Sequence, residues 1–184
     1  MSVPPEKRVV FGSTVEGLFI KGLGERITPA LRERLKTDAG LDLTRIQPAY
    51  ALDTWARALA LTVETLHPEL PRDEAYERLG TDLTRGFFET FLVRAVQTVI
   101  KLIGPRRTLL RTERNLRSGN NYTACSFIEH APNRIETTIN EPSVLRHTMT
   151  GLVREALLYA GAKNLKVELT RNDEQNSTWL VSWD

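Results

Sequence analysis

The residues of this chain that are best suited to chemistry lie between Lys101 and Tyr122, where a run of arginines leads into a polar turn. On a helix, three of these arginines share one face because they are spaced by four and three residues. A guanidinium group keeps its charge and binds a carboxylate or phosphate through two parallel hydrogen bonds. The turn adds free backbone N–H groups and an aromatic ring. The pattern predicts an anion-binding or partner-binding site made of Arg107, Arg111, Arg114, Arg117, Asn120, Asn121 and Tyr122.

A structural role is the alternative interpretation of the same arginines. They would then form a solvated face, or pair with Glu16, Glu136 or Glu141 inside the fold. Arginines that are paired with carboxylates within the protein are not available to a ligand. The sequence alone leaves both interpretations open.

Catalytic and metal-binding patterns are otherwise weak. Gly22–Ile27 lacks the third glycine of a dinucleotide-binding loop and does not follow an expected strand. Phe11–Val15 lacks the second glycine of a nucleophile elbow. The histidines His67, His130 and His147 stand in separate turns and helix starts, without the spacing of a metal site. No enzyme activity, metal or cofactor is therefore expected.

Two other functional classes stay as alternatives. A small hydrolase or transferase would use Cys125 as a thiol nucleophile, or a carboxylate such as Glu16. A single cysteine on an alternating strand is more typical of a small buried hydrophobe. Nucleic-acid binding is disfavoured, because the net charge is only +2 and aromatic residues make up 7 % of the chain.

Length and composition predict one globular domain over residues 1–184, with residues 1–10 as a flexible tail. The one cysteine excludes an internal disulfide and fits a reducing compartment. The most apolar stretch, Phe87–Ile103, contains three charged residues, which argues against a membrane span. The start of the chain has charges before any apolar run, so no signal peptide is expected. These features predict a cytoplasmic protein.

The apolar spacing predicts an α+β fold, in which a helical N-terminal part precedes a β-β-α-β-β antiparallel sheet unit. Thr28 is expected to cap a helix that starts at Pro29, and Gly104 with Pro105 to end one helix and start the next. The helices are expected at 14–22, 28–40, 53–66, 72–85, 87–103, 106–116 and 142–161, and the strands at 122–128, 134–140, 165–170 and 178–183.

Several stretches resemble a paralogous family of myxobacterial proteins without an assigned function. The matching segments span nearly the whole chain: Val10–Phe19, Pro48–Tyr50, Thr54–Arg57, His67–Pro68, Gly104–Arg107, Arg114–Thr123 and Val181–Trp183. Expansion of a family into many copies in gliding, fruiting-body-forming bacteria implies signalling or partner recognition rather than housekeeping catalysis.

The order of elements also resembles the haem-binding nitric oxide and oxygen sensor domain and its relatives in vesicle-tethering complexes. Relatives of that fold hold a haem or a fatty ligand between helices and sheet. The haem sensors need an axial histidine on the helix before the first strand, and that helix here carries Arg111, Arg114 and Arg117. The tyrosine-serine-arginine clamp for the haem propionates is also missing from Arg134–Leu145. The resemblance therefore implies the fold without haem.

Together these features predict a non-catalytic cytoplasmic sensor or interaction domain in bacterial signalling. An apolar cleft between helices and sheet, with an arginine-rich rim, would bind a small molecule or a protein partner. The strand that ends at Trp183 is a candidate edge for pairing, so a homodimer stays open.

Overall fold

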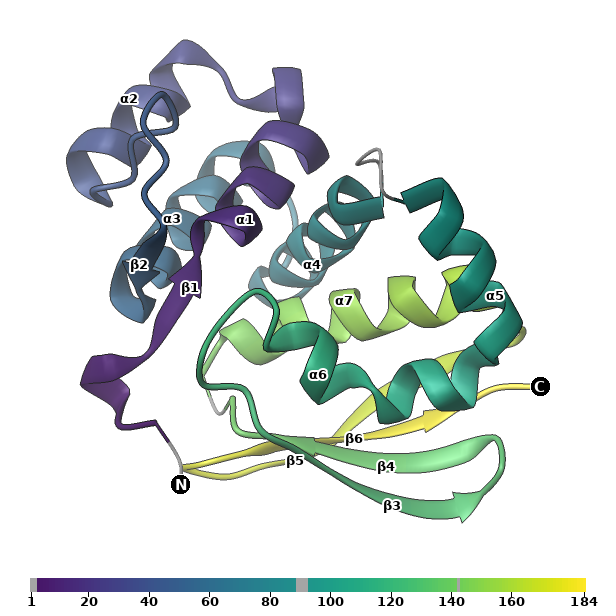
Figure 1. Cartoon of the computed structure of the whole chain (residues 1–184). Coiled ribbons are helices and arrows are strands. Elements are labelled where there is room, and N and C mark those ends of the chain that lie inside the picture. Colours follow the sequence, from purple (N-terminus) through teal and green to yellow (C-terminus); the bar gives the residue numbers. More distant parts are fainter. Residues whose placement is uncertain (1–2, 89–92, 142) are drawn as a thin grey trace.

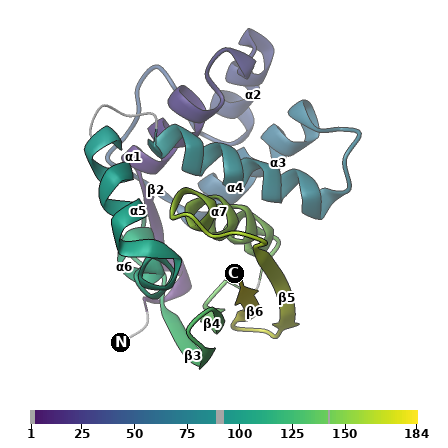
Figure 2. The same cartoon turned by 90° about the vertical axis from the view of Figure 1, so that its right-hand side faces the viewer.

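The computed structural model describes residues 3–88, 93–141 and 143–184, and only the backbone of residues 93–100. Its α+β architecture has a helical N-terminal part and a four-stranded sheet, and helix α7 lies between them (Figures 1 and 2). This arrangement confirms the expected fold class and element order. None of the helices described is long and apolar enough to cross a membrane.

The N-terminal part is built around a short antiparallel pair, β1 (Val9–Phe11) with β2 (Ala49–Ala51). The remaining elements are η1 (Pro5–Lys7), α1 (Gly12–Val15), the π-helix η2 (Glu16–Gly22), η3 (Gly24–Arg26), α2 (Pro29–Asp38) and α3 (Leu52–Leu66). Both strands escaped the sequence analysis because each has only three residues.

Within the segment expected as a tail, the described residues include η1 and the start of β1. Residues 5–7 form a 3-10 turn, and Val10, in β1, is only 3 % exposed. Val10 packs in the N-terminal core, and β1 connects this core to a distant turn described below. The cap at Thr28 is confirmed, since its Oγ1 accepts a hydrogen bond from the Leu31 N–H at 3.2 Å.

Helix α4 (Arg72–Phe88) packs between η2 and α7, and glycines permit both close contacts. A Cβ on Gly80 would lie 2.0 Å from the Thr148 carbonyl oxygen of α7, and a Cβ on Gly151 would lie 1.9 Å from the Glu77 carbonyl oxygen of α4. The expected helices over 72–85 and 87–103 were separated at Gly86. In the structure Gly86 instead lies inside α4, which continues to Phe88. A Cβ there would lie 2.1 Å from the Gly17 carbonyl oxygen of η2.

The segment between α4 and the sheet contains α5 (Val93–Leu110) and α6 (Thr112–Leu116). Gly104 interrupts α5 with φ 74° and ψ 172°, which confirms the expected stop and restart at Gly104 and Pro105. The expected single helix over 106–116 is wrong. Arg111, at φ −98° and ψ 4°, separates α5 from α6, so the arginines do not lie on one continuous helix face.

The expected helix over Phe87–Ile103, the most apolar stretch of the sequence, has the pattern of a buried helix, but residues 89–92 and the side chains of 93–100 lie outside the description. Near its two ends the side chains are not buried, since Phe87 is 54 % and Leu102 80 % exposed. Apolar composition alone did not distinguish a buried helix from one at the molecular surface.

The sheet has the strand order β3-β4-β6-β5, and all neighbours are antiparallel. Its strands are β3 (Cys125–Ala131), β4 (Arg134–Ile139), β5 (Lys166–Asn172) and β6 (Ser177–Ser182), and α7 (Leu145–Tyr159) covers one face. Pro142, the expected start of the α7 helix, lies outside the description. The C-terminal strand is not an edge: β6 pairs with β4 on one side and β5 on the other.

Alanine at Gly80 or Gly151 should destabilise the protein by about 1–3 kcal/mol, because either methyl group would overlap a backbone oxygen of the facing helix. The free energy of unfolding, measured by urea titration, tests this. Gly17→Ala is the matched control, since its Cβ would meet only Leu83 Cδ1 at 3.6 Å. Equal stability of Gly151→Ala and Gly17→Ala would contradict the close crossing.

Candidate functional site

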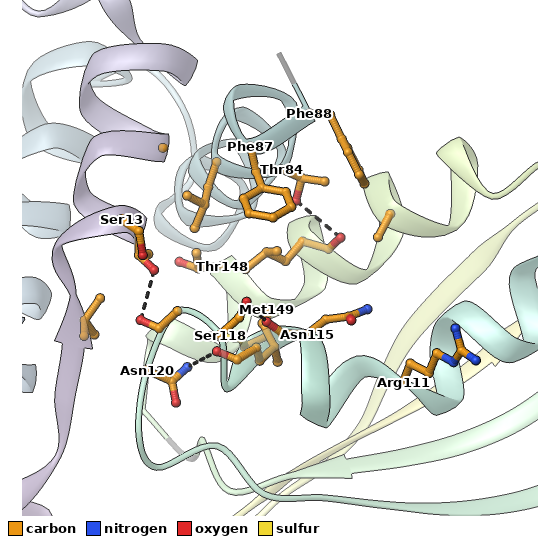
Figure 3. A pocket seen from close by; sticks show the side chains of 18 of the residues that line it. Ser13, Thr84, Phe87, Phe88, Arg111, Asn115, Ser118, Asn120, Thr148 and Met149 are labelled. Carbon is orange, nitrogen blue, oxygen red and sulfur yellow. Dashed lines mark hydrogen bonds between the residues drawn. The ribbon is translucent and has the colours of Figure 1, made fainter. Parts of the chain in front are cut away.

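A pocket of about 410 Å³ lies between the N-terminal part, α7 and the α5–α6 segment (Figure 3). Helix α4 supplies one wall through Leu83, Thr84, Phe87 and Phe88. Helix α7 contributes Thr148, Met149, Leu152 and Ala156, and β1, α1, η2, α3 and the segment from Ile103 to Tyr122 complete the lining. The volume and the mainly apolar lining are typical of small-molecule sites.

Three threonines of the lining are nearly or fully buried, and they differ in their hydrogen bonds. Thr84 donates its hydroxyl to the Gly80 carbonyl oxygen at 3.0 Å. The hydroxyls of Thr108, which is 5 % exposed, and Thr148, which is 2 % exposed, have no hydrogen-bond partner among the described residues. Buried hydroxyls are normally hydrogen-bonded, so these two are unsatisfied polar groups in the lining.

Of the predicted arginines, only Arg111 lines the pocket. It is the only charged side chain among the described lining residues, and Figure 3 shows it at the opposite end from Ser13. Arg107 and Arg114 are exposed and do not line it. Arg117 lies 4.0 Å from Glu113 and does not line the pocket either. The four predicted arginines therefore do not form one site.

The carboxylates that pair with this segment are not those anticipated. Arg106 forms a two-fold contact with Glu129, at 2.7 and 3.0 Å, and Glu113 faces Arg117. Glu113 also accepts a hydrogen bond from the backbone N–H of Cys125 at 2.9 Å. The Arg106–Glu129 pair and the hydrogen bond between Cys125 and Glu113 hold the segment against β3.

The polar turn, 118–121, connects the segment to β1. Asn121 accepts a hydrogen bond from the Val9 N–H at 2.9 Å and donates one to the Lys7 carbonyl oxygen at 2.9 Å. Asn120 accepts hydrogen bonds from the backbone N–H groups of Tyr122 and Thr123 at 3.0 and 2.9 Å. Asn120 and Asn121 thus use their amides within the fold, although Asn120 also lines the pocket.

Tyr122 lines the pocket but lies almost wholly within the core, where it is 5 % exposed. Its burial raises the pKa of the phenol above its usual value, and the nearby Glu141 carboxylate adds to this. The guanidinium of Arg8, the residue directly before β1, lies 5.5 Å from the centroid of the Tyr122 ring. The Arg8 charge lowers the pKa of the phenol, but burial outweighs it, so the phenol stays protonated.

The histidines do not gather into a metal site. His67 lies beside Arg26, His130 is 4.0 Å from Glu136, and His147 is 3.2 Å from Asp73. Within the part of the chain that is described, no group of three or more histidine, cysteine, aspartate or glutamate side chains could hold a metal ion.

Cys125 lies in β3, where burial, together with a smaller effect of the Glu113 carboxylate, raises the pKa of its thiol to about 12. A nucleophilic cysteine needs the thiolate, which this environment disfavours. Iodoacetamide should therefore alkylate Cys125 slowly at pH 7, and the rate should still rise steeply at about pH 10, where a thiol of ordinary pKa has levelled off. A rate that levels off by about pH 10, with the fold intact by circular dichroism, would contradict the raised pKa.

The threonines give a second test. Thr148→Val should leave stability unchanged or raise it, because the substitution removes a buried hydroxyl without a partner. Thr84→Val should lower the free energy of unfolding by about 1 kcal/mol, because a formed hydrogen bond is lost. Urea unfolding of the two variants under the same conditions measures the difference, and an equal loss in both would show that the Thr148 hydroxyl is bonded.

Comparison with solved structures places the chain in a known fold class. Unliganded Fe(II) H-NOX from K. algicida is 11 % identical with a TM-score of 0.68, over 95 % of this chain and 96 % of that one. A phenylalanine-to-leucine variant of Tt H-NOX is 14 % identical with a TM-score of 0.71, over 95 % of each chain. A structure concerned with haem distortion in the H-NOX family is 16 % identical with a TM-score of 0.69, over 94 % of each chain.

This chain therefore has an H-NOX-like fold, and identities this low show the fold alone. The chain belongs to the family described as a protein of unknown function (DUF2378), whose model matches residues 8–184. The expected membership of a family without an assigned function and the expected fold of the haem-binding nitric oxide and oxygen sensor domain are thereby confirmed. No curated protein matches the chain.

The pocket residues do not fit a haem. Haem iron in proteins is held by histidine, by a cysteine thiolate, by methionine together with histidine, or by tyrosine. The described lining residues include no histidine or cysteine. Met149 lacks a histidine beside it, and the raised pKa of Tyr122 disfavours the phenolate that would bind iron.

The sequence analysis missed most of the pocket, because its lining comes from helices far apart in the chain. It identified Arg111 and the residues of the turn, but not Thr84, Thr108, Asn115 and Thr148. One signal was present: each threonine adjoins a leucine or methionine that is largely or fully buried within a helix. A hydroxyl at such a position indicates a polar point in an otherwise apolar site.

Proposed function

We propose that this chain is a non-catalytic, cytoplasmic sensor domain of bacterial signalling that binds a small, largely apolar molecule. The observation that carries the proposal is the pocket of about 410 Å³ with two buried hydroxyls that lack partners in the described structure. An apolar pocket with a few polar groups is the general form of a ligand site.

The position of the pocket supports a sensor role. Its lining comes from both parts of the fold: Val10 and Trp55 belong to the N-terminal core, and Met149 belongs to the core between α7 and the sheet. A molecule bound there would contact both parts at once. It would therefore favour whichever relative arrangement of the two parts gives it the better contacts.

The fold adds support by analogy. One H-NOX structure is described by the distortion of its haem, so a protein of this fold carries a bound group. The donor set of the present pocket points to a different ligand, one held by apolar contacts and hydroxyls rather than by iron ligation. A protein docking on the arginines is less favoured, because Arg106 and Arg117 are already paired with glutamates.

N-phenyl-1-naphthylamine, an uncharged apolar dye that fluoresces when it leaves water, tests the proposal directly. The dye should bind the protein saturably, at one site per chain. Ala156→Phe should abolish most of this binding, because the added ring would occupy the pocket. Leu158→Phe is the matched control on the same helix, since Leu158 is 49 % exposed and does not line the pocket.

Gly17→Leu provides a second blocking variant, from η2, in case Ala156→Phe unfolds. Unchanged dye binding in a folded blocking variant would overturn the proposal. Native mass spectrometry of the protein, purified gently from its host, adds a direct readout. A mass above that of the chain would identify a retained ligand.

A further inference from the structure

We propose that the ligand of this pocket carries an anionic head group, which lies at the end formed by Thr108, Arg111 and Asn115. The inference rests on the proposed function, because it describes the molecule that the same pocket would accept. It is carried by the charge of the lining, by the spacing of these three residues and by the unpartnered hydroxyl of Thr108.

The charge of the lining is the first argument. Arg111 is the only charged lining residue among those described, so the pocket is cationic at one end and uncharged elsewhere. No described acidic side chain lies within ion-pair distance of Arg111, whereas Arg106 and Arg117 each have a glutamate. A cation without a carboxylate partner at a pocket rim favours an anion on the ligand.

The spacing is the second argument. Asn115 follows Arg111 by four residues, and its N–H donates to the Arg111 carbonyl oxygen at 2.9 Å, so one helical turn connects the two. Thr108 precedes Arg111 by three residues, and its carbonyl oxygen accepts a hydrogen bond from the Arg111 N–H at 3.2 Å. Figure 3 shows Asn115 between Ser118 and Arg111. A hydroxyl, a guanidinium and an amide thus line one side of the pocket.

The buried hydroxyl is the third argument. Thr108 is 5 % exposed, and its Oγ1 has no partner in the described structure. A second cavity, of about 50 Å³, adjoins the pocket here and is also lined by Thr108 and Asn115. Thr108 thus lines both cavities at this end, and its hydroxyl is a buried polar group without a partner, while Phe87, Met149 and Leu152 supply apolar lining.

Two dyes with the same skeleton test the inference. 1-Anilinonaphthalene-8-sulfonate is N-phenyl-1-naphthylamine with one added sulfonate, so the difference between their affinities reports the effect of the negative charge. Arg111→Gln should weaken sulfonate-dye binding about fivefold, the order expected for one charged contact at a partly exposed rim. Binding of the neutral dye should change less than twofold.

Arg114→Gln is the matched control, because it removes the same charge from the same segment without touching the pocket. The sulfonate dye should bind this variant as it binds the natural protein. An equal loss in Arg111→Gln and Arg114→Gln would overturn the inference and assign the effect to the general surface charge. Loss of both dyes in Arg111→Gln would also overturn it. If the neutral dye does not bind the natural protein, that result would instead contradict the proposed function itself.

Discussion

The close crossing of α4 and α7 is the contact on which the rest of the structure depends. Gly80 and Gly151 let each helix backbone approach the other, and the contact fixes the distance between the N-terminal core and the sheet. Ion pairs flank it: Glu77 contacts Arg154, and Arg85 lies 2.8 Å from Glu155. Charged pairs at such a border contribute little energy, but they fix the relative position of the helices.

The pocket follows from this geometry. Both helices line the pocket, with Phe87 on α4 and Met149 on α7, and the α5–α6 segment supplies a further side of the lining. The segment is held in turn by the hydrogen bonds between Asn121 and the strand at Val9. The polar turn that attracted attention in the sequence therefore positions a wall of the site more than it forms the site itself.

The comparison with H-NOX structures separates fold from chemistry. The architecture is shared over nearly the whole chain, at identities between 11 and 16 %. Thr108, Arg111 and Asn115 are among the residues that line the pocket from the segment before the sheet, and none of these three binds iron in the manner of a haem protein. One arrangement of helices and sheet can thus enclose different ligands when the lining changes.

The sequence by itself determined the α+β class, the order of the main elements, the cap at Thr28 and the interruption at Gly104, because apolar spacing and backbone restrictions act locally. It also indicated the arginine-rich segment. Only the tertiary structure decided that Arg111 lines the pocket while Arg107 and Arg114 do not, because the lining depends on which residues of the segment lie beside α4 and α7. The short strand at Val9 and the pocket threonines were likewise decided by contacts between residues far apart in the chain, which no local pattern encodes.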